Sequence, residues 1–348
     1  MMSSNSTTKE HASSHRRSLT EWARVHADQV WWLHSAYALL LGAGFIWLGS
    51  RNFTYLRVAV FHVSFIWLTS LLLPRLLTHP LVPHRWAPRI KLIINFFNKN
   101  LYQQMLFFVL PIYYASATPG SVNFVFVILV GLSAVLSTLD IIYDRHVSVK
   151  RSLNAAFFAF NLFALINVML PILWSVSNTV TTRISALLAF LGFLTLRYPS
   201  SPSSLRRAAI VAATGLAILG AVEIGRSMIP PAPLRLASVD FGRDFDREAM
   251  QVLSPVTALS TGDSLRLYGL TAVQAPLGLR EKLRHRWYQD GKLICASPLY
   301  NIVGGREEGF RLWTSCTFNA IRRNTELRLD LDTEGGQFIG RARLTAAN

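Results

Sequence analysis

The residues whose types and spacing best suit chemistry lie in the stretch HRWYQDGKLI, residues 285–294. Asp290-Gly291 is the kind of dipeptide most typical of a two-residue β-hairpin turn, so the stretch predicts two short strands. Alternation along a strand then puts His285 and Trp287 on one face. This pair suits an aromatic platform for a glycan or a peptide. The alternative is a core tryptophan beside a histidine that satisfies a strand end.

The opposite face of the same hairpin would carry Arg284, Arg286 and Tyr288. Two guanidinium groups and a phenol suit contact with a lipid headgroup, a glycan or a protein partner. The candidate ligand- or partner-binding residues are therefore Arg284, His285, Arg286, Trp287 and Tyr288, together with Trp313 from a later strand.

Catalytic chemistry is not indicated by this region. Asp290 is needed by the turn, and Ser315 has no evident base. A lone histidine cannot make a metal site, because structural and catalytic zinc sites need three or four ligands. We therefore assign no catalytic residue and expect neither a metal nor a cofactor.

The composition favours a membrane protein. Hydrophobic residues make up 51% of the 348 residues and charged residues only 16%, whereas soluble domains usually carry about 25% charged residues. The net charge of +16 does not indicate nucleic-acid binding, because the basic residues are scattered between apolar stretches. We expect the lipid bilayer as a partner and no nucleic acid.

Apolar stretches of the length that a membrane helix needs recur along the first two thirds of the chain. They predict a multi-pass bundle of about seven helices within residues 28–228, and they lie near 30–49, 56–73, 101–117, 121–139, 154–175, 179–196 and 208–225.

The distribution of Lys and Arg predicts the orientation of this bundle. The polar tail of residues 1–27 and the alternate loops 74–100, 140–153 and 197–207 hold fifteen Lys and Arg, against three in the other loops. Lys and Arg gather on the cytoplasmic side. We expect a bacterial inner-membrane protein with its N-terminus in the cytoplasm and its C-terminal part in the periplasm.

Three polar residues within the predicted spans are candidates for a function inside the membrane. Asn154 and Asn161 are seven residues apart and share a helix face, where they would line a polar cavity or hydrogen-bond between helices. Glu223 lies near the outer end of its span, one turn from Arg226, and a local ion pair explains it as well as a function does.

The last third of the chain changes to the pattern of strands. A Pro-rich linker, 229–234, ends the helical pattern, and apolar residues alternate through 235–348, as at Leu327, Leu329 and Leu331. Turns at Asp290-Gly291, at GGREEG (304–309) and at Gly335-Gly336 separate the strands. This pattern predicts an all-β sandwich domain.

Three stretches of this domain, HRWYQDGKLI, FRLWTSCTF (310–318) and ELRLDLDTEGGQFIGRARL (326–344), occur in order. Together they resemble a bacterial domain of unknown function, family 2914, which is often attached to membrane segments in Gram-negative bacteria. The resemblance implies a periplasmic β domain and no known reaction. Cys316 departs from the pattern expected for that family.

Two functions from different classes are consistent with the sequence. The first is an inner-membrane protein that presents its β domain for ligand binding or scaffolding, with an envelope protein or a glycan as partner. The alternative is a transporter or lipid-handling protein whose outer domain is regulatory. An enzyme acting on a lipid-linked substrate is a third, more distant hypothesis.

The cysteines of the chain, Cys295 and Cys316, predict a disulfide. Both lie in the domain expected in the oxidising periplasm. They sit on two strands that flank the turn GGREEG, and folding this hairpin about its midpoint sets residue 295 opposite residue 316. The alternative is two small buried thiols, because a shift of one residue in register would point them to opposite faces.

Overall fold

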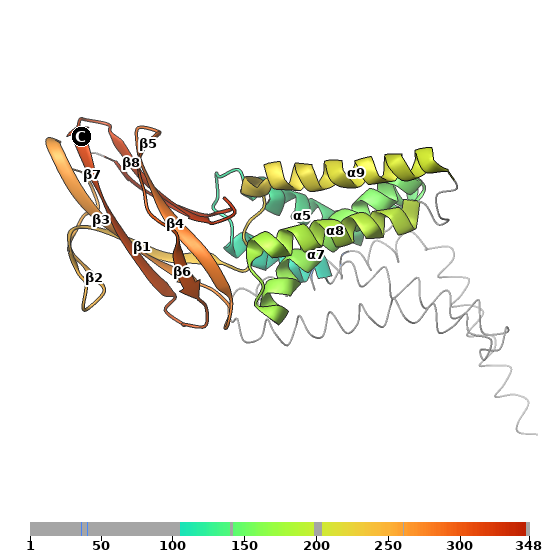
Figure 1. The fold of residues 1–348 in the computed structure, drawn as a ribbon, viewed down its shortest axis with the longest axis horizontal. Coiled ribbons are helices and arrows are strands. Elements are labelled where there is room, and N and C mark those ends of the chain that lie inside the picture. The colour runs from blue at the N-terminus through green and yellow to red at the C-terminus, as the bar shows by residue number, and fades with distance from the viewer. Residues whose placement is uncertain are drawn as a thin grey trace, which may run out of the picture.

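The computed structural model describes residues 105–139, 142–197, 204–259 and 261–345, together with Ala36 and Leu40. A helical part is followed along the chain by a two-sheet β sandwich, and the sandwich lies beyond one end of the helices (Figure 1).

The helical part consists of the helix Met105–Ala115, α5 (Phe124–Thr138), the π-helical turn η2 (Tyr143–Ser148), α7 (Arg151–Trp174), α8 (Asn178–Arg197), α9 (Leu205–Ile224) and the 3₁₀ turn η3 (Arg226–Met228). α7 ends where Ser175 adopts a left-handed conformation with φ of 54°. The chain then reverses directly into α8, so the two helices form an antiparallel hairpin that α9 extends (Figure 1).

The helices pack around one apolar cluster. It combines Tyr113 with Phe126 and Val130 of α5 and with Phe163 and Val168 of α7. The Tyr113 hydroxyl donates to the Ala164 carbonyl at 2.9 Å, which satisfies the phenol inside this core.

The expected seven-helix membrane bundle is wrong for the part of the chain that the structure describes. There, α7 alone is long and apolar enough to cross a membrane. The described portion of the first helix, Met105–Ala115, and α5 are too short to cross about 30 Å of hydrocarbon at 1.5 Å per residue. The apolar parts of α8 and α9, Asn178–Leu194 and Ala208–Ile224, also fall below the length required. The stretches expected at 30–49 and 56–73 lie outside the described residues, apart from Ala36 and Leu40.

The expected β sandwich is present. One antiparallel sheet has the order β2-β1-β3-β7, formed by β1 (Arg235–Asp246), β2 (Gln251–Pro255), β3 (Gly262–Gln274) and β7 (Phe310–Ile321). The other has the order β5-β4-β8-β9, formed by β4 (Arg280–Gln289), β5 (Lys292–Ala296), β8 (Glu326–Thr333) and β9 (Phe338–Thr345), with β6 (Tyr300–Val303) also paired to β4. Alternating leucines of β8, including Leu327, Leu329 and Leu331, point into the core between the sheets.

The β4–β5 hairpin has the turn that its sequence predicts. Asp290 and Gly291 have φ of 49° and 80°, and the flanking residues Gln289 and Lys292 pair directly. These are the positive φ values of the hairpin turn that Asp-Gly favours. The Asp290 carboxylate also accepts the backbone N–H of Glu326 at 2.9 Å, so the turn is fixed to the start of β8.

The Pro-rich linker, residues 229–234, is buried along its whole length. Ile229 and Ala232 belong to the helical core, while Leu234 belongs to the core of the sandwich. The Gln337 side chain donates to the Ile229 carbonyl at 3.2 Å. The linker therefore joins the two cores directly.

A carboxylate of the sandwich caps a helix of the other part. Glu281, 5% exposed, accepts the Asn178 backbone N–H at 2.7 Å at the first residue of α8. Burial raises the pKa of this carboxyl, although the bonds from Asn178 and Lys282 oppose the rise. A negative charge at a helix N-terminus is favourable, so Glu281 helps to fix the sandwich to the helices.

Candidate functional site

His285 and Trp287 lie in the core of the sandwich and not on an exposed platform. Their side chains are 0% and 1% exposed. Trp287 packs against Phe241 and Phe318, with ring centroids 5.8 Å away in each case. Of the two interpretations of this pair, the geometry agrees with the core tryptophan.

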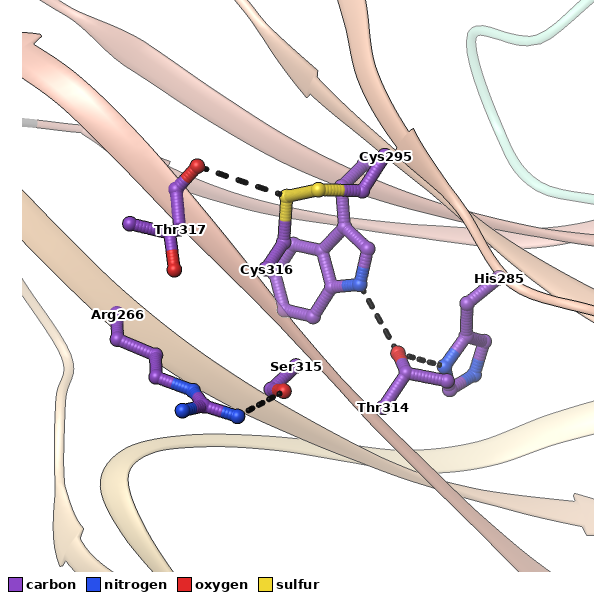
Figure 2. The surroundings of a disulfide bond; sticks show 8 residues. Arg266, His285, Cys295, Thr314, Ser315, Cys316 and Thr317 are labelled. Carbon is purple, nitrogen blue, oxygen red and sulfur yellow. Dashed lines mark hydrogen bonds between the residues drawn. A yellow bond between two sulfur atoms is a disulfide. The ribbon is translucent and has the colours of Figure 1, made fainter.

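Two threonines from the opposite sheet satisfy the polar atoms of this pair. Thr314 Oγ1 lies 2.9 Å from Trp287 Nε1 and 2.7 Å from His285 Nδ1 (Figure 2). Thr271 Oγ1 lies 2.9 Å from His285 Nε2. Thr271 in turn donates to the Leu312 carbonyl at 3.3 Å. Every hydrogen is used if Trp287 donates to Thr314, Thr314 donates to Nδ1, and the Nε2 hydrogen goes to Thr271.

Burial favours a neutral imidazole in this network. Burial lowers the pKa of His285 from 6.5 to about 3, because no carboxylate in the described part of the chain compensates a charge there. His285 is therefore a structural residue that links the two sheets by hydrogen bonds.

A disulfide joins Cys295 of β5 to Cys316 of β7, with the Cα atoms 6.1 Å apart (Figure 2). The two strands are not a hairpin, and the expected register is wrong. Cys295 pairs with Trp287 in one sheet, and Cys316 pairs with Leu267 in the other. The chain changes sheets at the GGREEG turn, so the disulfide connects two sheet edges across the sandwich.

Arg284 and Arg286 lie on the outer surface of the second sheet, as the alternation predicted. The pairing of β4 with β8 places Arg284 opposite Asp332 and Arg286 opposite Asp330. The pairing of β8 with β9 then adds the arginines of β9 to the same surface. We call this surface the arginine face, and define it by Arg284, Arg286, Arg328, Arg341 and Arg343. Its carboxylates are Glu326, Asp330 and Asp332, so the cations outnumber the acids.

The acids of the arginine face are mostly covered. Asp330 and Asp332 are 3% and 0% exposed. Arg341 holds Asp330 through two bonds of 2.7 and 2.8 Å, and Arg286 contacts Asp332. Burial raises the pKa of Asp332 from 3.8 to about 6 and outweighs the opposing effect of Arg286.

The guanidinium groups of this face bind its acids without being fully covered. Arg286 contacts Asp332, Arg328 lies 3.4 Å from Asp330, and the Arg286, Arg328 and Arg341 side chains are 30%, 21% and 23% exposed. Arg328 also lies over the ring of Tyr288, 4.1 Å from its centroid, which holds this planar cation against the sheet. The face is thus suited to accept further carboxylate or phosphate oxygens.

Trp313 lies far from this face, on the outer surface of the first sheet. Its ring stacks on Phe245 at 4.7 Å, and Tyr268 lies 6.2 Å away. Arg247 lies over Trp313 and Arg266 lies over Tyr268, both at 5.3 Å. The structure therefore separates Trp313 from the other predicted binding residues.

A groove of about 530 Å³ opens between the edges of the two sheets, beside the disulfide. One wall is β7 from Phe310 to Ser315, and the other is the segment that leads from Cys295 to Asn301. Its location could not be derived from local patterns, because it depends on how β6 and β7 separate into different sheets.

The polar residues predicted inside the membrane do not come together. Asn154 accepts a hydrogen bond from Tyr143 at 2.8 Å. Asn161 is 4% exposed, and its amide atoms have no partner in the described part of the chain. Glu223 is on α9 and pairs with Arg183 and Arg226, both at 2.6 Å. The ion pair expected between Glu223 and Arg226 is therefore present.

Within the described residues, no group of His, Cys, Asp and Glu could hold a metal ion. The model of the Family of unknown function (DUF5924) matches residues 13–272, most of the chain, and the chain therefore belongs to that family. A domain of unknown function was expected, and this family is a different one from family 2914. No curated protein matches the chain.

Proposed function

We propose that this member of the DUF5924 family is a membrane-attached binding protein of the bacterial cell envelope. Its β sandwich presents the arginine face to an anionic partner, which is an envelope protein or a glycan. The single observation that carries the proposal is the composition of that face. Five arginines surround three acids, two of which are buried and already engaged.

Attachment to the inner membrane is supported by the helical part. α7 has the length and composition of a membrane-crossing helix. Exposed large apolar side chains also line neighbouring helices, and they include Ile128, Leu129 and Leu132 of α5 and Leu187, Leu188 and Leu191 of α8. Soluble surfaces seldom collect such residues, so lipid contact is the natural use of these helices.

A periplasmic position of the sandwich is supported by charge and by the disulfide. Arg151, Arg197 and Arg206 lie at the ends of α7, α8 and α9 remote from the sandwich, whereas Asn178 at the near end contacts Glu281. Basic residues favour the cytoplasmic side. A disulfide between Cys295 and Cys316 persists in an oxidising compartment.

The resemblance of the last third of the chain to family 2914 also supports the proposal. Its three stretches fall on β4–β5 and β8–β9 of one sheet and on β7 of the other, and all contribute to one core. They all follow residue 272, where the DUF5924 match ends. We therefore propose that the end of the chain is a domain of the 2914 type, joined to the DUF5924 region within one sandwich.

The test replaces Arg284, Arg286 and Tyr288 by Ala together in the full chain. The anionic partner should no longer co-purify with this variant in mild detergent, while near-ultraviolet circular dichroism should show a folded sandwich. A matched control changes Arg322 and Arg323 to Ala, two exposed arginines in the turn after β7, and should retain the partner. An unchanged partner set in the triple variant would show that the arginine face is not the binding surface.

A further inference from the structure

β7 is a long edge strand with one side unpaired. Its twelve residues pair with β3 along their length, and no other strand in the described part of the chain pairs with its second side. Such an edge presents backbone N–H and C=O groups that can accept another strand, so proteins usually cover or interrupt it.

Only the C-terminal half of this edge is covered. The disulfide holds Cys316 to β5, and the Gln289 side chain donates to the Asn319 carbonyl at 2.9 Å. The second contact also shows which backbone groups face outward. Asn319 points its carbonyl away from β3, so alternate residues from Arg311 to Ser315 do the same.

The N-terminal half of β7 borders the groove of about 530 Å³ instead. An added strand would lie about 4.8 Å from β7, in the space toward Ser297 and Tyr300 of the opposite wall. The volume lies within the range of ordinary ligand sites, roughly 300–1,000 Å³. The disulfide closes the end of this space, so an added strand would stop at Cys316.

The two sides of such a strand would meet different surroundings. Side chains directed between the sheets would meet Leu312, Trp287 and Tyr300, which are apolar or aromatic. Side chains directed to the outer surface would meet the rim formed by Arg247 and Arg266 over the rings of Trp313 and Tyr268.

The positive charge of the rim is not neutralised by an ion pair within the described part of the chain. Arg266 donates to the Ser315 hydroxyl at 3.2 Å (Figure 2), and neither Arg266 nor Arg247 has a carboxylate partner in the described part of the chain. Arg311 is different, because Glu308 holds it at 3.0 Å. No carboxylate is among the groove-lining residues.

We propose that this groove binds an extended peptide segment of a partner protein, which adds as a strand to β7 between Arg311 and Ser315. The segment alternates acidic with apolar residues. Acidic side chains pair with Arg247 and Arg266, and apolar side chains enter the gap between the sheets. This is recognition by strand addition, in which backbone bonds give affinity and alternate pockets give specificity. None of these residues belongs to the arginine face, so the two proposals fail separately.

The probe is a fluorescein-labelled pool of hexapeptides in which Glu or Asp alternates with Val, Leu, Ile or Phe. Full-length protein in mild detergent should raise the anisotropy of the label at peptide concentrations below about 1 mM. Hydrogen exchange should slow at the backbone amides of residues 311, 313 and 315, which face away from β3. Methylation of alternate peptide nitrogens should weaken binding about tenfold or more, because it removes the bonds to the edge.

Charge reversal tests the rim. The double variant Arg247→Glu and Arg266→Glu should no longer bind the acidic peptides. It should instead bind a pool of peptides with Lys at the same positions. The matched control, Arg322→Glu and Arg323→Glu, changes the net charge equally and should keep the acidic preference. Absence of binding by the acidic pool, insensitivity to N-methylation, or protection at another segment would each overturn the proposal.

Discussion

The hydroxyl of Thr314 lies 2.7 Å from Nδ1 of His285 and also accepts the indole N–H of Trp287 at 2.9 Å. One side chain of the first sheet therefore satisfies two polar groups of the second. Because these groups are buried, removal of this oxygen would leave both without a partner in the core.

Replacing Thr314 by Val should destabilise the sandwich by about 2 kcal/mol or more, because Trp287 and His285 would each lose a buried partner. The measurement is chemical unfolding followed by tryptophan fluorescence. Thr317→Val on the same strand is the control, since this side chain is exposed and should change stability by no more than about 0.5 kcal/mol. Equal effects of the two substitutions would contradict the network.

Acid should destabilise the protein through His285. Its pKa is about 3 in the folded state and 6.5 ordinarily. Between about pH 3 and pH 6.5, the unfolded chain therefore binds a proton at this side chain that the folded protein does not. Stability is therefore lost as the pH falls below about 6.5, by up to about 1.4 kcal/mol per pH unit. The difference in unfolding free energy between the wild type and His285→Gln should therefore shrink as the pH falls from about 6.5 to about 3. A constant difference would exclude the buried neutral imidazole.

Asp332 should act in the opposite direction. Its pKa is raised in the folded state from 3.8 to about 6, so the folded protein binds the extra proton. This contribution to stability is present at low pH and is lost as the pH rises through about 6. Asp332→Asn should therefore gain stability relative to the wild type between about pH 4 and pH 6. If Arg286 instead keeps the carboxylate ionised, the variant will show no such gain in parallel unfolding curves.

The disulfide should contribute about 3 kcal/mol, because it closes a loop with a sequence separation of 21 residues. Thiol counting on denatured, unreduced protein should find no reactive thiol. Cys295→Ser and Cys316→Ser should each lower the unfolding free energy by a similar amount, and the double variant by no more than either. Two reactive thiols per chain would disprove the bridge.

The proposed orientation can be tested with reporter fusions. A reporter that is active only in the cytoplasm should work when fused near residue 148, in η2, and should fail at the C-terminus. The reason is that the basic ends of the helices lie remote from the sandwich. A periplasmic reporter is the control and should give the reverse result. Activity of the cytoplasmic reporter at the C-terminus would refute the periplasmic position of the β domain.

Local signals in the sequence predicted local structure well. The Asp290-Gly291 turn and the inward leucines of β8 follow from turn chemistry and from period-two alternation. Apolar stretches marked the helices, and α7, α8 and α9 begin one to three residues before the stretches predicted for them. The stretch 121–139 was longer than α5, because hydropathy alone does not show that Ser121 and Asn123 form a turn before α5 begins.

Features that depend on distant pairing could not be predicted. Thr271 and Thr314 are separated along the chain from His285, and only the facing of two sheets brings them together. The pairing of the cysteines was derived from a hairpin that does not exist. β6 pairs with β4 and β7 pairs with β3, and the bridge spans the gap between their sheets.

The buried linker determines how the molecule responds to proteases. Ile229, Ala232 and Leu234 are each less than 10% exposed, and a protease needs an extended, accessible segment. The boundary between the helical part and the sandwich is therefore a poor cleavage site. Digestion should instead begin in exposed turns such as GGREEG, and the sandwich should remain attached to its helices.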